Sequence, residues 1–221
     1  MNFGAWLDWT PELLDGLKVS GQLTAAVVVL GTLMALGLAL MRDSRLRAVR
    51  ILSLVVMEVG RGFPALIGLY LVYYGLPSTG LALGSFAAAT AALAFAFAAY
   101  TCDVIHAGIQ AVPRGQIEAS RALGIGRATE FRKIVLPQAT RIILPPMLTW
   151  AVLYFQTTSI AFTVAVPEAM TRASTIAAGN FEYLGVYAQV GLLYAIFCIP
   201  TSFLVQHLER RRFDGMQSLG S

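Results

Sequence analysis

The chain has 221 residues, of which 57% are hydrophobic and 13% are charged, and its mean hydropathy is +0.69. Soluble domains carry about 25% charged residues, so about half of the usual charge is missing. This composition excludes a disordered chain, a nucleic-acid-binding domain and an ordinary cytosolic enzyme, and it indicates an all-α membrane protein. The two cysteines, Cys102 and Cys198, lie in or beside apolar stretches and predict no disulfide framework.

Five stretches are apolar and long enough to cross a membrane, which takes about 20 residues per helix. Only the second contains charged residues, Glu58 and Arg61. The third is rich in alanine, which predicts close packing between helices, and we expect Pro145 and Pro146 to begin the fourth helix. Residues 1–221 are therefore expected to form one transmembrane domain. Its spans are residues 19–41, 51–74, 81–101, 142–167 and 183–206.

The basic residues predict the orientation, because short cytoplasmic loops collect Lys and Arg. Thirteen of the 16 Lys and Arg residues lie between spans one and two, between spans three and four, or after span five. The acidic segment that precedes span one lies on the opposite side. We therefore expect the N-terminus outside and the C-terminus in the cytoplasm. The basic groups are Arg42, Arg45, Arg47 and Arg50; Arg114, Arg121, Arg127, Arg132, Lys133 and Arg141; and Arg210, Arg211 and Arg212.

The segment 103–141 is far longer than the 2–8 residues that usually connect the helices of a bundle. Pro113 suits the first turn of a helix over 116–123, and Gly124 suits the stop that follows it. A second helix is expected over 127–135. Such a structured cytoplasmic element predicts a docking partner, and the alternative is a basic hairpin lying on anionic membrane lipid.

The same segment contains a motif of fixed spacing. Glu118, Ala119 and Ser120 are followed after three residues by Gly124, and after nine more by Ile134-Val135-Leu136-Pro137. This pattern resembles the EAA motif of permease subunits of binding-protein-dependent ABC importers, with Ser120 where alanine is commonest. A match at several points of fixed spacing is a strong signal.

The resemblance extends to the branch of that family that takes up polar amino acids. Gly60-Arg61-Gly62-Phe63-Pro64 is similar to its Arg-Gly-Thr-Pro element, and Thr158-Ser159-Ile160 resembles its Thr-Ser-Leu element. The chain departs from the branch at Asp103 and His106, which replace Glu and Arg, and at Gln156, where a lysine is common. These differences leave the identity of the solute open.

The resemblance implies that a short helix over 116–123 docks on an ATPase subunit and transmits its motion to the spans. Glu118 offers charge to the partner or caps the helix start, and Gly124 permits a sharp turn. A solvated acid at a helix start is the alternative for Glu118. The residues assigned to ATPase coupling are Glu118, Ala119, Ser120, Gly124, Ile134, Leu136 and Pro137.

Polar groups within the apolar spans are the candidates for the substrate path, because they are costly in hydrocarbon. Glu58 and Arg61 are three residues apart, so they form either an ion pair with each other or a substrate contact. Phe63-Pro64 breaks the helical hydrogen bonding, as binding sites of transporters often do.

A second group of candidates is Gln156, Thr157, Thr158 and Ser159. Four consecutive polar residues cover one whole turn, so at least one faces the bundle, where it suits a zwitterionic amino acid. The alternative is that the hydroxyls bond to carbonyls of their own helix. The substrate-path residues are Glu58, Arg61, Pro64, Gln156, Thr157, Thr158 and Ser159.

The chain contains no phosphate-binding loop of the type Gly-x-x-x-x-Gly-Lys-Ser/Thr. We therefore expect a transport subunit that is no enzyme and binds no cofactor, with ATP and Mg²⁺ on a separate ATPase. No metal site is expected, because Cys102, Asp103 and His106 at one helix end make a poor zinc site. The other expected partners are a second permease, identical or related, a solute-binding protein and membrane lipid in a bacterial inner membrane. The alternative is a structural or assembly subunit of another membrane complex.

Overall fold

The computed structural model describes the backbone of residues 3–217 and the side chains of residues 6–205. The side chains of Arg210, Arg211 and Arg212, on which part of the predicted orientation rests, lie outside this range. The described residues form helices and no strands. The helices are α1 (Phe3–Arg42), α2 (Arg47–Gly62), α3 (Ala65–Tyr70), η1 (Leu71–Gly75), η2 (Leu76–Thr79), α4 (Ser85–Gln110), α5 (Arg114–Ala122), α6 (Arg127–Glu130), η3 (Phe131–Val135), α7 (Leu136–Thr157), η4 (Thr158–Val164), α8 (Ala169–Asn180) and α9 (Tyr183–Gln217).

Four of these helical segments are long and apolar enough to cross a membrane, and a fifth span results if α2 and the segment Ala65–Thr79 are counted together. The first expected span, 19–41, is the C-terminal part of a much longer helix. Helix α1 has 40 residues and includes the acidic N-terminal segment.

The second expected span, 51–74, is a broken helix. The axes of α2 and of the segment after it differ by 103° at the break. Phe63 is extended, with φ −99° and ψ 134°, and Pro64 follows it. A residue before proline disfavours the helical conformation, and proline itself has no N–H to donate. The predicted break is present, and it is a sharp bend between two helical segments.

The third helix starts and ends later than expected. Helix α4 runs to Gln110, so Asp103 and His106 belong to the helix and not to the loop after it. Most of its alanines are buried, and α1 is packed along it. At Gly31 of α1, a Cβ atom would lie 2.6 Å from Phe97 Cδ1. This close approach agrees with the packing predicted from the alanine content.

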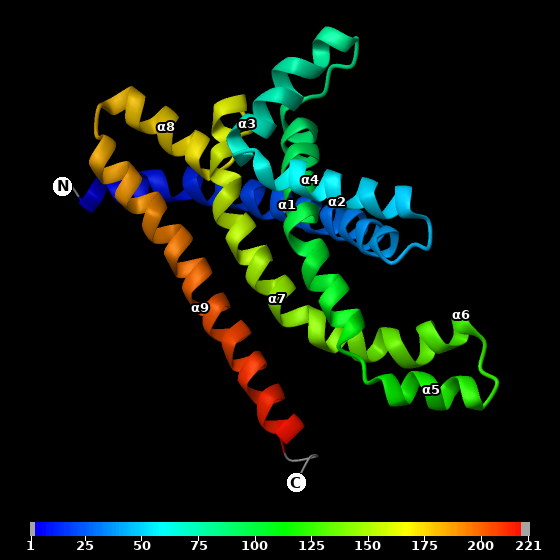
Figure 1. The fold of residues 1–221 in the computed structure, drawn as a ribbon. Helices are drawn as coiled ribbons and strands as arrows, with labels where there is room; N and C mark the ends of the chain where they lie inside the picture. Colours follow the sequence, from blue (N-terminus) through cyan, green and yellow to red (C-terminus); the bar gives the residue numbers. More distant parts are fainter. Residues whose placement is uncertain (1–2, 218–221) are drawn as a thin grey trace.

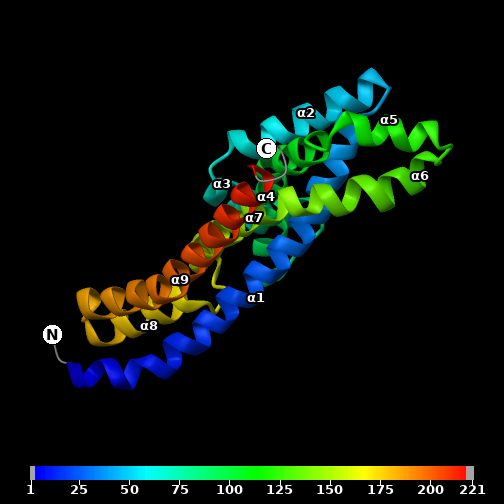
Figure 2. The ribbon, with the colours of Figure 1, turned by 90° about the horizontal axis from the view of Figure 1, so that it is seen from below.

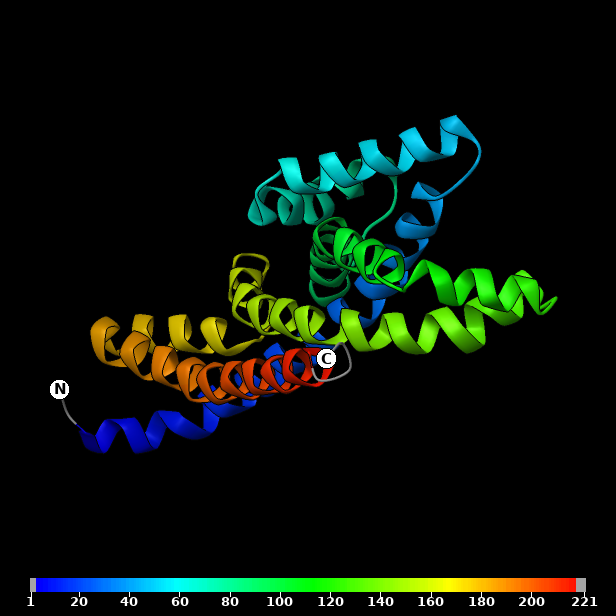
Figure 3. The same cartoon turned by 60° about the horizontal axis from the view of Figure 1, so that its bottom comes forward.

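The expected loop 103–141 is reduced to a helical hairpin, Arg114–Val135, between α4 and α7. Its first arm is α5 and its second arm is α6 with η3 (Figure 3). The second arm continues into α7, so helix runs from Arg127 to Thr157. The prediction that Pro145 and Pro146 begin this helix is wrong, because they lie inside α7. Proline interrupts single backbone hydrogen bonds, and a long helix in a membrane tolerates this where its neighbours support it.

The molecule has two distinct ends. The N-terminus, α8 and the start of α9 lie at one end, and the hairpin and the turn between α1 and α2 lie at the other (Figures 1 and 2). Helix α7 ends in the 3-10 helix η4, and Ala165 then adopts a left-handed conformation with φ 57° before α8 begins. Helices α8 and α9 pack against each other, and α8 also packs against α1.

Candidate functional site

The hairpin carries the residues of the Glu118 motif on an exposed arm. Pro113 is extended and directly precedes α5. Glu118 and Ala119 are exposed on α5, whereas Ser120 is buried. Gly124 has φ 72°, a conformation that glycine adopts without cost. The short turn between the two arms of the hairpin therefore depends on this glycine.

The base of the hairpin is fixed to the transmembrane helices. Val112, Val135 and Ala139 form an apolar cluster, with Ile117 of α5 packed against it. Gln138 Nε2 donates a hydrogen bond to Gln116 Oε1 at 2.5 Å. Of the other motif residues, Ile134 is partly buried, while Leu136 and Pro137 begin α7 and are exposed.

Arg61 does not pair with Glu58. Its Nη2 donates to Asp103 Oδ2 at 2.6 Å, and its Nε donates to the carbonyl oxygen of Ala99 at 2.8 Å. Arg42 at the end of α1 forms an ion pair with the other oxygen of Asp103. Glu58 is exposed, and no ion pair of its side chain occurs among the described residues. Asp103 thus joins α1, α2 and α4.

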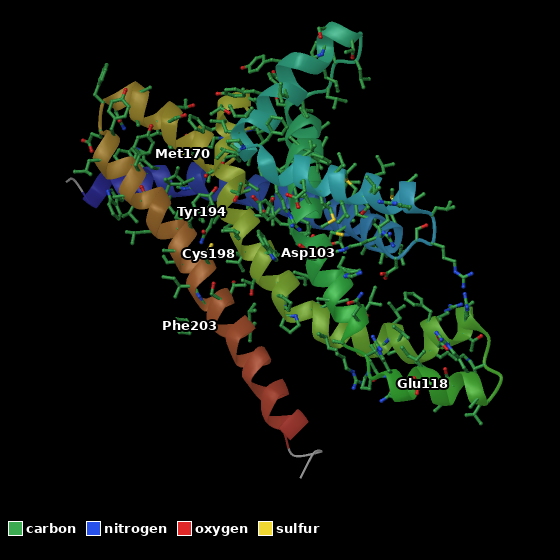
Figure 4. All side chains as sticks on the ribbon, viewed as in Figure 1. Asp103, Glu118, Met170, Tyr194, Cys198 and Phe203 are labelled. Carbon is green, nitrogen blue, oxygen red and sulfur yellow. The ribbon has the colours of Figure 1, made fainter. Side chains whose placement is uncertain are left out.

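Two further contacts extend this network. The guanidinium of Arg61 lies 5.8 Å from the ring centre of Tyr100, a cation–π distance. Tyr100 stacks on Trp150 of α7 with ring centres 5.1 Å apart. His106 Nε2 lies 3.0 Å from Asp43 Oδ1 in the turn after α1. Contacts from α1, α2 and α7 therefore gather on the part of α4 that carries Tyr100 and Asp103 (Figure 4).

The polar residues at the end of α7 have different environments. Thr157 Oγ1 donates to the carbonyl oxygen of Leu153 at 2.9 Å, and Thr158 Oγ1 donates to that of Phe155 at 2.7 Å. The alternative of hydroxyls bonded to their own helix therefore describes both threonines. Ser159 is partly buried and Gln156 is exposed. Pro64, at the break of the second span, is also exposed.

Gln156 lines a groove between α7 and α9. Its cavity volume is about 240 Å³, and its lining includes the polar side chains Thr149, Gln156 and Ser202. An adjoining hollow shares Gln156 and Ser202 and is also bordered by Cys198 and Phe203, both of which Figure 4 shows on α9. The described residues that line the two spaces include no charged side chain. The groove suits an uncharged polar ligand or a partner helix with polar side chains.

A buried acid that the sequence did not single out lies at the start of α8. Glu168 is 0% exposed, and its carboxylate accepts hydrogen bonds from the N–H groups of Met170 and Thr171 at 2.9 and 2.8 Å. The hydroxyls of Tyr194 and Ser20 also donate to it, at 3.1 and 3.3 Å. Burial raises the pKa of Glu168, and the donors oppose this shift. The acid joins α1, α8 and α9.

The indications in the sequence differ for the two acids Asp103 and Glu168. Asp103 was visible as an acid beside an apolar stretch, but the sequence placed it outside the helix. Glu168 gave no helix-start signal, because Ser, Thr, Asp and Asn are the residues typical of that position. Among the described side chains, no three His, Cys, Asp or Glu residues gather where a metal would bind.

Residues 19–214 match the family described as "Binding-protein-dependent transport system inner membrane component". The chain belongs to this family. The permease is 37% identical to the octopine transport system permease protein OccM of Rhizobium radiobacter over 205 residues, which cover 89% of this chain and 82% of OccM. It is 34% identical to the probable glutamine ABC transporter permease protein GlnM of Bacillus subtilis, over 96% of this chain and 98% of GlnM.

Solved structures agree with this assignment. An amino acid ABC transporter, crystallised with histidines, matches the permease with a TM-score of 0.86 and 32% identity, over 96% of this chain and 99% of that chain. The MetNI methionine ABC transporter matches with a TM-score of 0.65 and 19% identity, over 97% and 98% of the two chains, and so shares the fold. The resemblance predicted from the Glu118 motif is confirmed, and the permease is a transport subunit with several membrane-spanning helices.

Proposed function

We propose that the permease moves a polar amino acid or a related small solute into the cell across a bacterial inner membrane by alternating access. The relatives named for octopine and glutamine transport support this class of solute. A binding protein delivers the solute on the outside. A separate ATPase subunit binds ATP and Mg²⁺ and hydrolyses the ATP, while this chain binds no cofactor.

The N-terminus lies outside the cell and the C-terminus inside. The arrangement of the two ends supports this orientation. The basic hairpin and the Arg42–Arg47 turn lie at one end, and the acidic start of α1 lies at the other with α8 (Figure 1). The positive-inside rule assigns the basic end to the cytoplasm.

The hairpin docks on the ATPase through α5. Glu118 is exposed on this arm, and Leu123 at the turn is 80% exposed. In Figure 4, Glu118 lies at the far end of the molecule from Met170 of α8. An arm that protrudes from the membrane with an exposed acid and an exposed leucine suits a groove on a partner protein.

The solute passes along the groove between α7 and α9, at a contact with a second permease. Gln156 and the neighbouring Ser202 are polar groups on a membrane helix surface, and polar groups avoid direct contact with lipid. A second permease, identical or related, would cover them and complete a path that one chain is too small to enclose.

Co-purification from membranes tests this function. The tagged chain, extracted in mild detergent, is expected to bring down an ABC ATPase. Glu118→Arg and Gly124→Leu are expected to lose the ATPase while the chain still inserts, because one replaces the exposed acid of the docking arm by a cation and the other strains the turn. Glu182→Arg, the same change on an exposed residue at the opposite end, is the matched control. Recovery of the ATPase with all three variants would refute docking through α5.

A further inference from the structure

The hairpin contains a buried carboxylate. Glu130 of α6 is 6% exposed although most residues around it are exposed. Arg121 of α5 donates from Nε to Glu130 Oε2 at 3.0 Å and from Nη2 to Oε1 at 3.1 Å. Ser120, which is 3% exposed, has its hydroxyl 3.0 Å from Oε2. We call Ser120, Arg121 and Glu130 the Glu130 cluster.

The cluster is placed where the two arms have little else to hold them together. Near the turn, Gly124 and Gly126 supply no side chain, and Leu123 faces solvent. The apolar contacts of α5 lie at the base of the hairpin, where Ile117 packs against Val135 and Ala139. A two-pronged contact between arginine and a carboxylate fixes both distance and orientation. The tip of α5 is therefore held to α6 mainly by the Glu130 carboxylate.

The arm that carries Glu130 is continuous with the candidate substrate path. Helical residues run from Arg127 to Thr157, with a bend where the hairpin arm meets α7 (Figure 1). Along this path, about 39 Å of helix separates Glu130 from Gln156 at 1.5 Å per residue. The chain connects α5 to α4 through the turn at Ala111–Pro113 and to α6 through the turn over 123–126. At the base of the hairpin, Gln116 and Ile117 also join α5 to the start of α7. Toward the tip, the Glu130 cluster is the side-chain contact that ties α5 to the arm leading into α7.

We propose that Glu130 is a positioning residue that makes α5 and α7 move as one rigid body. Through Arg121 and Ser120, it transmits a displacement of α5 to α7 and so to the groove at Gln156. Without the cluster, the arms pivot about the base, and α5 moves while α7 lags behind. This inference rests on the proposed docking of α5 on the ATPase.

Spin labels measure this rigidity in the assembled transporter. One label is placed at Ala122→Cys on α5 and the other at Leu153→Cys on α7. Both positions are exposed, and the two native cysteines are buried. The distance between the labels is measured in lipid nanodiscs with the ATPase bound, without nucleotide and after trapping with ATP and vanadate. With Glu130 present, a narrow distribution that ATP leaves unchanged is expected.

Glu130→Ala and Arg121→Ala are expected to broaden this distribution and to shift it when ATP is trapped. The exchanged pair Arg121→Glu with Glu130→Arg is expected to restore the narrow distribution, which a general loss of folding would not allow. Lys133→Ala, which removes a cation from the same hairpin, is the control and is expected to match the parent. A narrow, ATP-independent distance in Glu130→Ala would overturn the inference, and so would a failure of the exchanged pair to restore it.

The two proposals fail in different ways. If the parent chain brings down no ATPase, docking through α5 is refuted, yet the label distance in the permease alone still reports whether Glu130 holds the arms together. If the ATPase remains bound to Glu130→Ala and the distance stays narrow, docking stands and the positioning role of Glu130 is refuted.

Discussion

Arg61 Nη2 lies 2.6 Å from Asp103 Oδ2, and this ion pair joins the last turn of α2 to the C-terminal part of α4. Arg61 is two residues before the extended Phe63, so the pair holds the broken second span beside its bend. Arg42 shares the same carboxylate. One acid therefore balances two cations that come from different helices.

Asp103→Asn is expected to destabilise the permease by about 1–3 kcal/mol, because two partly buried guanidinium groups then face each other without an anion. The midpoint of thermal unfolding, measured in detergent by tryptophan fluorescence, reports the loss. Glu58→Gln removes the same charge from an exposed site on α2 and is expected to leave the midpoint unchanged. Equal shifts in both variants would contradict the role of Asp103 as the shared anion.

The spacing of residues along one helix could not predict that Asp103 is the partner of Arg61. Glu58 and Arg61 are three residues apart, and that spacing permits a pair, but it says nothing of an acid 42 residues further along the chain. Asp103 comes within reach only because α4 continues to Gln110 and because α2 bends away after Gly62. The break at Phe63-Pro64 was predictable from proline chemistry, whereas its angle of 103° depends on the packing of α3 against α4.

Local patterns predicted other elements correctly. Pro113 and Gly124 bracket α5, because both residues act through their own backbone preferences. The same reasoning failed at Pro145 and Pro146. Helix α7 continues through both prolines, because it is long and its neighbouring helices support it. The family resemblance was readable because the Glu118 motif is contiguous. Glu130 lies in the unspecified interval between Gly124 and Ile134 of that motif, and Glu168 lies outside it; the roles of both acids depend on contacts across turns and between helices.

Gly16→Ala is expected to separate α1 from α8. A Cβ atom at Gly16 would lie 2.7 Å from Ala169 Cα and 2.8 Å from Ala169 N, and backbone atoms have little room to move. Overpacking of this kind costs about 1–3 kcal/mol. The control is Gly21→Ala on the same helix, where nothing lies within 4 Å, and where alanine is expected to stabilise by up to about 1 kcal/mol. The midpoint of thermal unfolding is expected to fall in Gly16→Ala and to rise in Gly21→Ala. A gain of stability in Gly16→Ala would contradict the close contact.

Glu168 is expected to make stability depend on pH. Burial raises its pKa above the ordinary value of 4.5, so the folded protein binds this proton more tightly than the unfolded chain does. The stability that the group contributes is then complete below pH 4.5 and is lost as the pH rises through the raised pKa. The thermal midpoint of the parent minus that of Glu168→Gln should therefore fall as the pH increases above about 4.5.

The control for this titration is Glu182→Gln, which removes an exposed acid close to α8 in the chain. Its difference from the parent is expected to stay flat over the same range. If the thermal midpoint of the parent minus that of Glu168→Gln grew with pH, the pKa of Glu168 would be lowered. The hydrogen-bond donors at the start of α8 would then outweigh the effect of burial.

Gln156→Ala is expected to lower solute uptake about 2- to 10-fold, the loss of one hydrogen bond to a bound ligand. Uptake is measured in cells that express the complete transporter, with isotope-labelled protein amino acids supplied together and quantified by mass spectrometry. Thr157→Val is the matched control, because the Thr157 hydroxyl is already bonded to the Leu153 carbonyl and has no donor left for a solute. Both variants are expected to retain the ATPase on co-purification. Equal uptake by the parent and Gln156→Ala would move the solute path away from the groove between α7 and α9, since Gln156 carries the one side-chain amide among the described residues that line it.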